Sequence, residues 1–449
     1  MTVAAALPAD ELYARNLIGG SWEFAAAPFD YEIRNPVDGT VTTVVPLSSR
    51  VDVARAVTAA GSAAASWAAD PSARRDLLTR LAAEIGQCAE PLARLQALET
   101  GLGLTDSRAA MAALSRFCGI ALNGESPGTP AAGVSGQILS WGLPFAEVVC
   151  AVLPQLHAGR TAVIKPSLRA PMSAAAFAHL ATSTGFPPGV LNLVQGTGVD
   201  VGTALASTPG LAALHVRAGA RTLSQAARAV AVTRTPLTCL RAAGNIALAG
   251  PDADLAPVAD AVTTALRTHS AGGPLSLPLL CVHSSVADAL LDAILARLET
   301  CHPAPLPAEP LRDRALARVA ALLARGGRLL RGGQVPDDVR HRMGWVLPPT
   351  VIMAGAMRGE AAVAATGPAD PVGPILTVVT WRSPAELAGM FPHPRYGDGM
   401  ACTWGLDDAE LAGAALPHTV ILPEKTPIAA LAGGRLPAAW TADASIRSG

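Results

Sequence analysis

Several features that mark nucleic-acid-binding, membrane and secreted proteins are scarce in this chain of 449 residues. Its formal net charge is −1 and aromatic residues make up 4%, so it lacks both a basic footprint for phosphates and stacking platforms for bases. No uninterrupted apolar run reaches about 18 residues, which argues against a membrane-spanning helix. The first residues carry no basic stretch before an apolar one, so we expect no secretory signal and a cytoplasmic location.

The spacing of the cysteines and the scarcity of lysine are also informative. The seven cysteines are scattered and never spaced as CxxC, which is typical of reduced thiols and argues against a disulfide framework or a metal site. Of the 34 basic residues, only Lys165 and Lys425 are lysines. The abundant arginine, alanine, glycine and proline resemble a coding bias, so a lysine is more informative than an arginine. Lys165 therefore becomes a candidate functional residue.

Apolar residues make up 50% of the chain, and they fall in alternating helix-like and strand-like segments. This alternation predicts an α/β protein with largely parallel sheets. A strand at 161–164, a helix at 171–184 and a strand at 190–194 predict a βαβ unit, the usual frame of a nucleotide site. Earlier in the chain, apolar spacing predicts helices over 50–67 and 72–99.

A second series of alternating segments begins near Cys239 and runs to about residue 421. Its apolar spacing and its loop residues predict both kinds of element. The predicted helices lie at 252–267, 285–299 and 309–325, and the predicted strands at 246–249, 279–283, 350–353 and 375–380. We place the hinge between the two series near 235–245.

Short phrases recur in a fixed order along both series. They are Gly20-Ser21-Trp22, Asn35-Pro36-Val37-Asp38-Gly39, Ser140-Trp141-Gly142-Leu143-Pro144, Ile164-Lys165-Pro166-Ser167, Gly185-Phe186-Pro187-Pro188-Gly189, Pro349-Thr350-Val351 and Gly373-Pro374. In order and spacing this set resembles the aldehyde dehydrogenase superfamily over nearly the whole chain. The resemblance implies an aldehyde dehydrogenase-like α/β fold, with two Rossmann-like parallel-sheet domains and an oligomerisation arm.

The resemblance also implies how the chain is divided. It places a dinucleotide-binding-like domain at 1–123 and 137–238, and a catalytic-like domain at 239–421. The segments 124–136 and 422–449 correspond to the arm with which family members add strands to a neighbouring subunit. Both segments are short and contain proline, so we expect a reduced arm and a monomer or homodimer instead of a tetramer.

The family's chemistry needs a cysteine thiolate that attacks the aldehyde, donors that hold the oxyanion, NAD(P) as hydride acceptor and a glutamate that activates water. The resemblance places Leu275 at the cysteine position, or Pro274 if the alignment shifts by one residue. It places Leu240 at the glutamate position and Gly142 at the position of an asparagine donor. None of these side chains can perform the corresponding step.

Two thiols lie near the replaced positions and are candidates for a displaced nucleophile. Cys281 falls within a predicted buried strand, where a cysteine usually acts as a small apolar side chain. Cys239 directly precedes Leu240, so its thiol could face the same tunnel. For each of them, a structural role is the other interpretation.

Cofactor-binding groups are retained unevenly. The Lys165-Pro166-Ser167 phrase is present, and the resemblance implies that its lysine reaches the adenosine ribose or a 2′-phosphate. Trp141 is a further candidate, and Asp370 replaces the glutamate that holds the nicotinamide ribose. The pyrophosphate-binding phrase is reduced to Val216-Arg217-Ala218-Gly219. We expect no tightly bound cofactor, with weak binding of NAD or NADP as the alternative.

Three functions follow as hypotheses. The favoured one is a protein that has lost thiol-dependent aldehyde oxidation and binds an unidentified small molecule or protein partner, without nucleic acid or membrane. The second is an enzyme that uses the same tunnel for different, biosynthetic chemistry, for which Arg217, Arg241, His269 and Ser276 are polar candidates. The third is an NAD(P)-dependent aldehyde dehydrogenase with a displaced cysteine.

Overall fold

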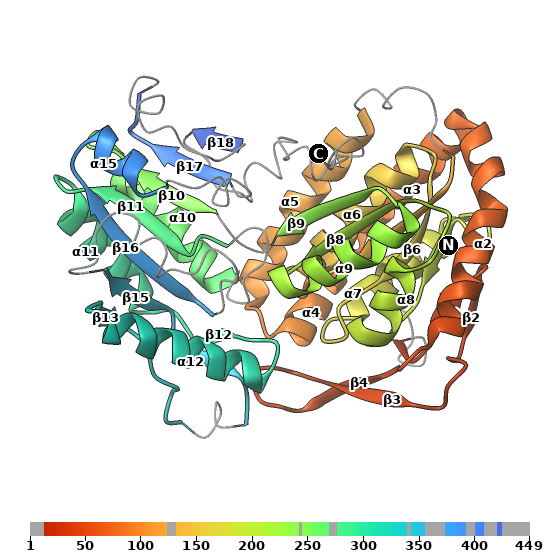
Figure 1. Cartoon of the computed structure of the whole chain (residues 1–449), viewed down its shortest axis with the longest axis horizontal. Helices are drawn as coiled ribbons and strands as arrows, with labels where there is room; N and C mark the ends of the chain where they lie inside the picture. Colours follow the sequence, from red (N-terminus) through yellow and green to blue (C-terminus); the bar gives the residue numbers. More distant parts are fainter. Residues whose placement is uncertain are drawn as a thin grey trace. The chain divides into compact units, whose positions relative to one another are not determined.

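The computed structural model describes residues 13–123, 132–241, 245–268, 276–338, 343–354, 373–391, 400–407 and 420–423. They belong to two compact units, which are treated separately below (Figure 1). Of the described residues, unit 1 contains those through Asn35 and then Thr40–Leu240, and unit 2 contains Pro36–Gly39 and those from Arg241 to Pro423. Within the described ranges, no helix combines the length and the apolar character needed to cross a membrane.

Unit 1 is built on a seven-stranded sheet with the order β2-β1-β7-β6-β5-β8-β9. The strands are β1 (Asn16–Ile18), β2 (Ser21–Glu23), β5 (Val134–Ile138), β6 (Thr161–Lys165), β7 (Leu191–Leu193), β8 (Leu211–Ala218) and β9 (Leu237–Arg241). β5 pairs in parallel with β6 and β8, and β6 pairs in parallel with β7, whereas β1 is antiparallel to both neighbours. Because the strand order reverses at β5, the β5–β8 pair forms a topological switch point.

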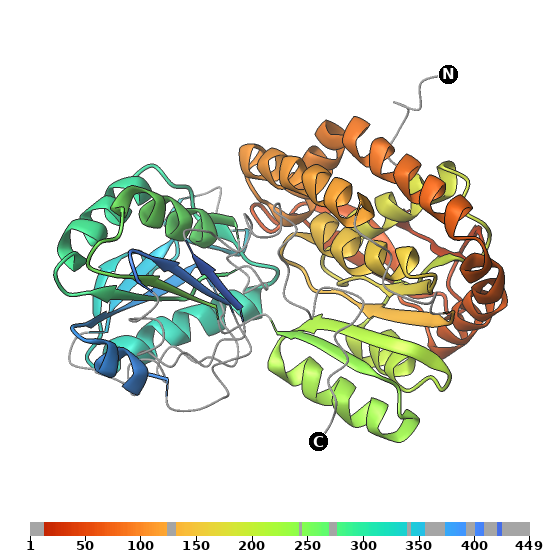
Figure 2. The same cartoon turned by 90° about the horizontal axis from the view of Figure 1, so that it is seen from above.

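Helices cover both faces of this sheet. They are α2 (Arg50–Ala69), α3 (Pro71–Gln87), α4 (Ala89–Thr100), α5 (Leu104–Asn123), α6 (Pro144–His157), α7 (Met172–Ser183), η1 (Gly198–Gly202), α8 (Thr203–Ala206) and α9 (Ala220–Thr233). One face forms a hydrophobic core with α2, α8 and α9, and α6 contacts β5, β6, α3, α5 and α7. In Figure 2 the light-green α9 lies on one side of the sheet, and orange and yellow helices lie on the other.

The single helix predicted over 72–99 is two helices. α3 ends at Gln87 and α4 begins at Ala89, because Cys88 between them departs from helical geometry with φ −90° and ψ 13°. The αL residue Gly101 then ends α4, as its φ of 71° allows without strain. The predicted βαβ unit is confirmed as β6, α7 and β7.

Unit 2 holds a second seven-stranded sheet, with the order β13-β15-β16-β11-β10-β17-β18. Its strands are β10 (Ile246–Ala249), β11 (Leu279–His283), β13 (Arg328–Arg331), β15 (Thr350–Met353), β16 (Ile375–Trp381), β17 (Met400–Trp404) and β18 (Val420–Pro423). Only the β13–β15 pairing is antiparallel among the pairings of these described strands. The predicted α/β class with largely parallel sheets is confirmed.

The remaining described elements are helices of unit 2 and two small sheets. The helices are α10 (Leu255–Thr268), α11 (Ala287–Leu298), α12 (Glu309–Ala324) and α15 (Pro384–Gly389), and the small sheets pair β3 (Asp30–Arg34) with β4 (Val41–Pro46) and β12 (Ala304–Pro305) with β14 (Val346–Leu347). Of the expected arm, 124–131 and 424–449 lie outside the described residues. The monomer or homodimer therefore stays a prediction.

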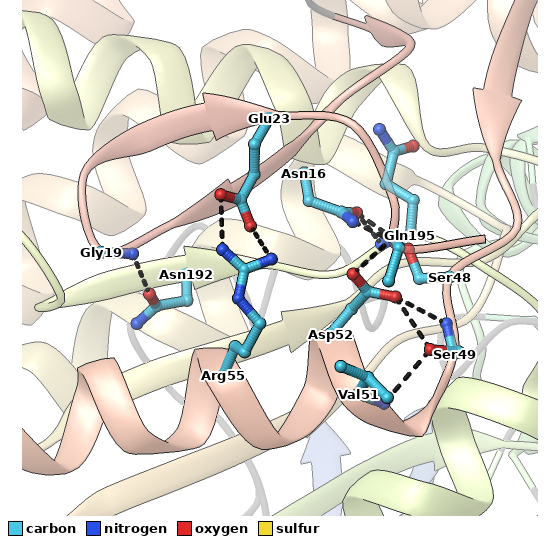
Figure 3. Close-up of polar contacts among 11 residues, drawn as sticks. Asn16, Gly19, Glu23, Ser48, Ser49, Val51, Asp52, Arg55, Asn192 and Gln195 are labelled. Atoms are coloured by element: carbon cyan, nitrogen blue, oxygen red, sulfur yellow. Dashed lines mark hydrogen bonds and ion pairs between the residues drawn. The ribbon is translucent and has the colours of Figure 1, made fainter. Parts of the chain in front are cut away.

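Buried polar side chains fix the β1 edge of the unit 1 sheet (Figure 3). Asn16 Nδ2 donates to Ser48 Oγ at 2.8 Å, and the Gln195 N–H donates to Asn16 Oδ1 at 2.9 Å. The Gly19 N–H donates to Asn192 Oδ1 at 2.9 Å. These bonds tie β1 to the chain that leaves the carboxyl end of β7, and so hold in place the loop that leads to η1.

Asp52 joins the start of α2 to the chain after β2. Its carboxylate accepts the N–H and the hydroxyl of Ser49, at 2.9 and 3.1 Å, and also the Ala26 N–H at 2.9 Å. Ser49 is the N-cap of α2, and the two residues form a capping box. The Asp52 side chain is fully buried, so no water can replace a lost partner.

We predict that Asp52→Asn lowers the free energy of unfolding by about 1–3 kcal/mol, because an amide nitrogen replaces the oxygen that accepts both Ser49 donors. Asp76→Asn, at an exposed position of α3, should change it by no more than about 0.5 kcal/mol. Urea denaturation of both variants measures the difference. Equal losses in the two variants would show that the capping box contributes nothing specific.

Candidate functional site

The carboxyl ends of β5, β6, β7 and β8 meet at one edge of the unit 1 sheet, because these strands run parallel. In doubly wound α/β sheets, ligands bind beyond this edge, at the switch point of the strand order. The chain leaves β5 through Leu139–Leu143, β6 through Pro166–Pro171, β7 through Val194–Thr197 and β8 through Gly219. These connections form the candidate site.

Lys165 is the last residue of β6, and only 4% of it is exposed. Its Nζ donates to the Pro166 carbonyl at 2.8 Å, which is the one hydrogen bond this ammonium makes within the described part of the chain. An ammonium has three donors, so two remain for a ligand. Burial lowers the pKa of Lys165 from 10.5 to about 8.

The Lys165 stem packs beside η1. A Cβ built on Gly202, the last residue of η1, would lie 4.0 Å from Lys165 Cδ. The loop before η1 is itself ordered, because Thr197 Oγ1 accepts the Asp200 N–H at 2.9 Å as the N-cap. The lysine is therefore held between the ends of β6 and β7.

The N-terminus of α9 follows β8 directly. Gly219 is the N-cap of this 14-residue helix and, having no side chain, makes no capping bond to its first N–H groups. The unpaired N–H groups and the helix dipole favour an anion at such an end. Together with the buried Lys165 ammonium, they fit a ligand that carries phosphates.

A buried charged pair lies at the switch point itself. Glu147, on the first turns of α6, accepts the Ser140 N–H at 2.9 Å and also the Ser140 hydroxyl. Burial raises the pKa of Glu147, whereas the Ser140 bonds and the nearby Arg217 guanidinium lower it. Arg217 lies near the end of β8 and is 4% exposed.

Two further polar residues lie side by side on the switch-point strands. Gln137 of β5 and His215 of β8 are partners in register, so their side chains share a face of the sheet. Gln137 Oε1 and His215 Nε2 are both buried without a hydrogen-bond partner among the described residues. Burial, together with Arg217 and Arg160, lowers the pKa of His215 to about 3, so its ring is neutral near pH 7.

The structure brings several predicted site residues to the same edge. Trp141 and Gly142 are buried in the connection after β5, and the half-buried Ser167 follows Lys165, where its Oγ accepts the Arg169 N–H at 3.3 Å. The backbone of Leu240 and Arg241 lies at the end of β9. Ser276 belongs to unit 2, where its carbonyl accepts Asn245 Nδ2 at 2.9 Å. Asp370, Pro274, Leu275 and His269 lie outside the described residues.

The two candidate thiols differ in their surroundings. Cys281 is fully buried within β11, and burial raises its pKa to about 12, so it stays a neutral thiol and a poor nucleophile. Cys239 lies on β9 and is half-buried against the core shared with β8 and α9. A hydrogen bond of 2.8 Å from the Leu214 N–H of β8 to the carbonyl of Pro236, the residue before β9, joins the two strands where β9 begins.

Sequence reasoning missed Glu147, Gln137 and His215. A signal for Glu147 was present, since it is a lone charge in the otherwise apolar first turns of α6, and a charge on an apolar helix requires a partner. Gln137 and His215 gave no such signal, because their pairing depends on the register of two strands far apart in sequence. Arg217 was named only as one polar candidate among several.

Comparison with known proteins places these residues in a family context. Residues 24–411 match the model of the aldehyde dehydrogenase family. A 3,6-anhydro-α-L-galactose dehydrogenase from Streptomyces coelicolor is 28% identical over 85% of this chain and 82% of its own length. A hydroxyisobutyraldehyde dehydrogenase from Mycolicibacterium austroafricanum is also 28% identical, over 85% of this chain and 79% of its own length.

Solved structures agree with this fold. PnpE from Pseudomonas sp. WBC-3 has a TM-score of 0.81 at 25% identity, covering 92% of this chain and 90% of its own, and it has also been solved with nicotinamide adenine dinucleotide. Betaine aldehyde dehydrogenase from Staphylococcus aureus has a TM-score of 0.81 at 22% identity, covering 93% and 89%, and shows the fold alone. The predicted aldehyde dehydrogenase-like fold is confirmed.

These comparisons correct the favoured interpretation of the sequence. The prediction of a protein that has lost aldehyde oxidation is wrong, because relatives that align over most of the chain are named as dehydrogenases. The expectation of no cofactor also loses its support, since PnpE is solved with the dinucleotide. The error was to infer lost chemistry from three positions along short phrases, which do not show which groups meet in the folded site.

The buried amine of Lys165 should make stability depend on pH. Between about pH 8 and 10.5 the unfolded chain keeps the lysine proton that the folded chain has lost, so stability rises with pH across this window. Lys165→Met removes this contribution. The variant's stability relative to wild type should therefore be greatest near pH 7 and decrease towards pH 10, as measured by urea unfolding. Arg80→Met, at an exposed position of α3, is the control, and an equal pH dependence in both variants would contradict the account.

Proposed function

Because the chain belongs to the aldehyde dehydrogenase family, we propose that it oxidises an aldehyde with NAD or NADP as the electron acceptor. The observation that carries this proposal is the edge of the unit 1 sheet. There Lys165 is buried at the end of β6, and two of its donors have no partner among the described residues. The N-terminus of α9, with a glycine N-cap, follows β8, and β6 and β8 lie on either side of β5. Both are suited to the phosphates and ribose of a dinucleotide.

The chain's part in holding the cofactor follows from these groups. The first N–H groups of α9 would hold the pyrophosphate, and the Lys165 ammonium would donate to the adenosine ribose or to a 2′-phosphate. Ser167 and Trp141 lie in the adjoining connections. The nicotinamide, when bound, supplies the acceptor for the hydride that leaves the aldehyde carbon.

Cys239 is the thiol that we assign to the attack on the aldehyde. Its thiolate would form the bond to the carbonyl carbon while the carbonyl electron pair moves to the oxygen. That carbon would then lose its hydride to the nicotinamide acceptor and become a thioester, and water would cleave the carbon–sulfur bond to release the acid and the thiol. Support comes from its partial exposure and from its place on β9, next to the switch-point strand β8. Cys281 lacks both properties.

The oxyanion needs a donor that the side chain at position 142 cannot give. We assign this role to backbone N–H groups of Trp141–Leu143, since the Leu139 and Ser140 N–H groups already donate to the Lys165 carbonyl and to Glu147. Main-chain amides serve as oxyanion donors in other acyl-transfer sites. Glycine at position 142 supports this assignment, because the absence of a side chain lets a reacting group approach the backbone closely.

The substrate class that we propose is a hydroxylated aldehyde. The two relatives are named for 3,6-anhydro-α-L-galactose and hydroxyisobutyraldehyde, and both of these aldehydes carry hydroxyl groups. The half-buried Ser140 hydroxyl at the switch point suits such a substrate better than a hydrocarbon chain. Isobutyraldehyde, which lacks the hydroxyl, is the matched comparison.

We expect the full chain to reduce NAD or NADP when hydroxyisobutyraldehyde is the substrate. Its kcat/KM should be lower for isobutyraldehyde, and the absorbance of the reduced nicotinamide measures both rates. Cys239→Ser should lower kcat by roughly a hundredfold or more, because it removes the nucleophile. Cys301→Ser, at another half-buried thiol, should leave kcat unchanged.

Two results would contradict these assignments separately. No reduction of either dinucleotide by the wild-type chain with any aldehyde would overturn the proposed activity. Turnover in Cys239→Ser that equals turnover in Cys301→Ser would leave the activity standing and overturn the assignment of the thiol.

A further inference from the structure

The connection Leu139–Leu143 has little regular structure of its own, yet it leaves β5 at the switch point. It carries Trp141 and Gly142, both buried, and it leads into α6, which begins at Pro144. The N-cap of α6, Leu143, makes no side-chain capping bond. Some other group must therefore fix this connection.

Glu147 supplies that fixation. Although it lies in the first turns of α6, its carboxylate accepts donors from the preceding connection, namely the N–H of Ser140 at 2.9 Å and the Ser140 hydroxyl. Each oxygen accepts one donor. Because Glu147 is only 5% exposed, water cannot substitute for either bond, and losing one leaves a buried donor unsatisfied.

Arg217 supplies the opposite charge from the other strand of the switch point. β8 pairs with β5 in register, with Val216 opposite Ile138, so Arg217 lies beside the residue at which the connection begins. The charge of Arg217 opposes the effect of burial on Glu147. Among the described residues, the neutral His215 ring also faces Arg217, and the Cys150 thiol of α6, itself next to Cys118 of α5, interacts with both members of the pair. Burial raises the pKa of both thiols, so they stay neutral and add no charge.

We propose that Glu147 is a positioning residue, which holds the Ser140–Leu143 backbone at the switch point in the form that the dinucleotide binds. This inference rests on the proposed function and extends it to a residue outside the phrases shared with the family. Glu147 touches neither the aldehyde nor the cofactor in this role. It acts through Ser140, and the charge of Arg217 opposes the effect of burial on its carboxylate.

Glu147→Gln tests the proposal, because its amide nitrogen cannot accept a Ser140 donor. We expect the Kd for NAD or NADP, measured by calorimetry on the full chain, to rise about tenfold. Amide hydrogen exchange of residues 139–143 should become faster at the same time. Ser140→Ala, which removes only the hydroxyl donor, should cause a smaller change in the same direction and serves if Glu147→Gln does not fold.

Asp52→Asn is a matched control, since Asp52 also accepts the N–H and the hydroxyl of one serine while fully buried in the same unit. A merely structural role for Glu147 would make the two variants alike. The proposal requires that Asp52→Asn leave both the Kd and the exchange of 139–143 near wild type. Equal effects in both variants, or wild-type behaviour of Glu147→Gln, would overturn it.

Failure of the proposed function gives a different result. If the wild-type chain binds neither NAD nor NADP, the proposed function is overturned, and so is the dinucleotide as the ligand of the Leu139–Leu143 connection. The exchange measurement needs no ligand, so it still shows whether Glu147 holds residues 139–143 in place.

Discussion

The burial of one lysine at the end of a parallel strand is the constraint on which the site depends. The Lys165 ammonium is buried away from water and keeps one hydrogen-bond partner among the described residues. This burial lowers its pKa and costs folding stability. Such a cost is expected at functional sites, where a ligand supplies the missing partners. The rest of unit 1 serves this arrangement, since β1, β7 and η1 are tied together by the bonds of Asn16, Gln195 and Thr197.

Charge is distributed unevenly around that edge. Among the described residues, Lys165 and the N-terminus of α9 provide positive potential without a carboxylate partner, whereas Arg217 at the switch point lies near Glu147. An anionic ligand therefore fits beside Lys165 and the N-terminus of α9, whereas Glu147 and Arg217 can hold the backbone after β5 in place. This division of roles separates binding of the cofactor from the positioning of the connection after β5.

Much of the fold could be predicted from the sequence, because apolar periodicity is a local signal. The strands at 246–249 and 279–283 are observed as predicted, while the break at Cys88 was missed although Gly86 and Pro91 flank it. The site was harder, since Ser140, Glu147 and Arg217 meet only through the pairing of β5 with β8. Loss of activity was wrongly inferred for a related reason: comparing positions along a family phrase does not show which groups meet in space.

Calorimetric titration with NAD and NADP, of the wild-type chain beside Lys165→Met and Arg80→Met, tests the central claim most directly. The account predicts micromolar binding of one dinucleotide to wild type and to Arg80→Met, and binding about tenfold weaker or more in Lys165→Met, because a charge-assisted hydrogen bond is lost. Wild-type affinity in Lys165→Met, or no binding of either dinucleotide to the wild-type chain, would contradict it.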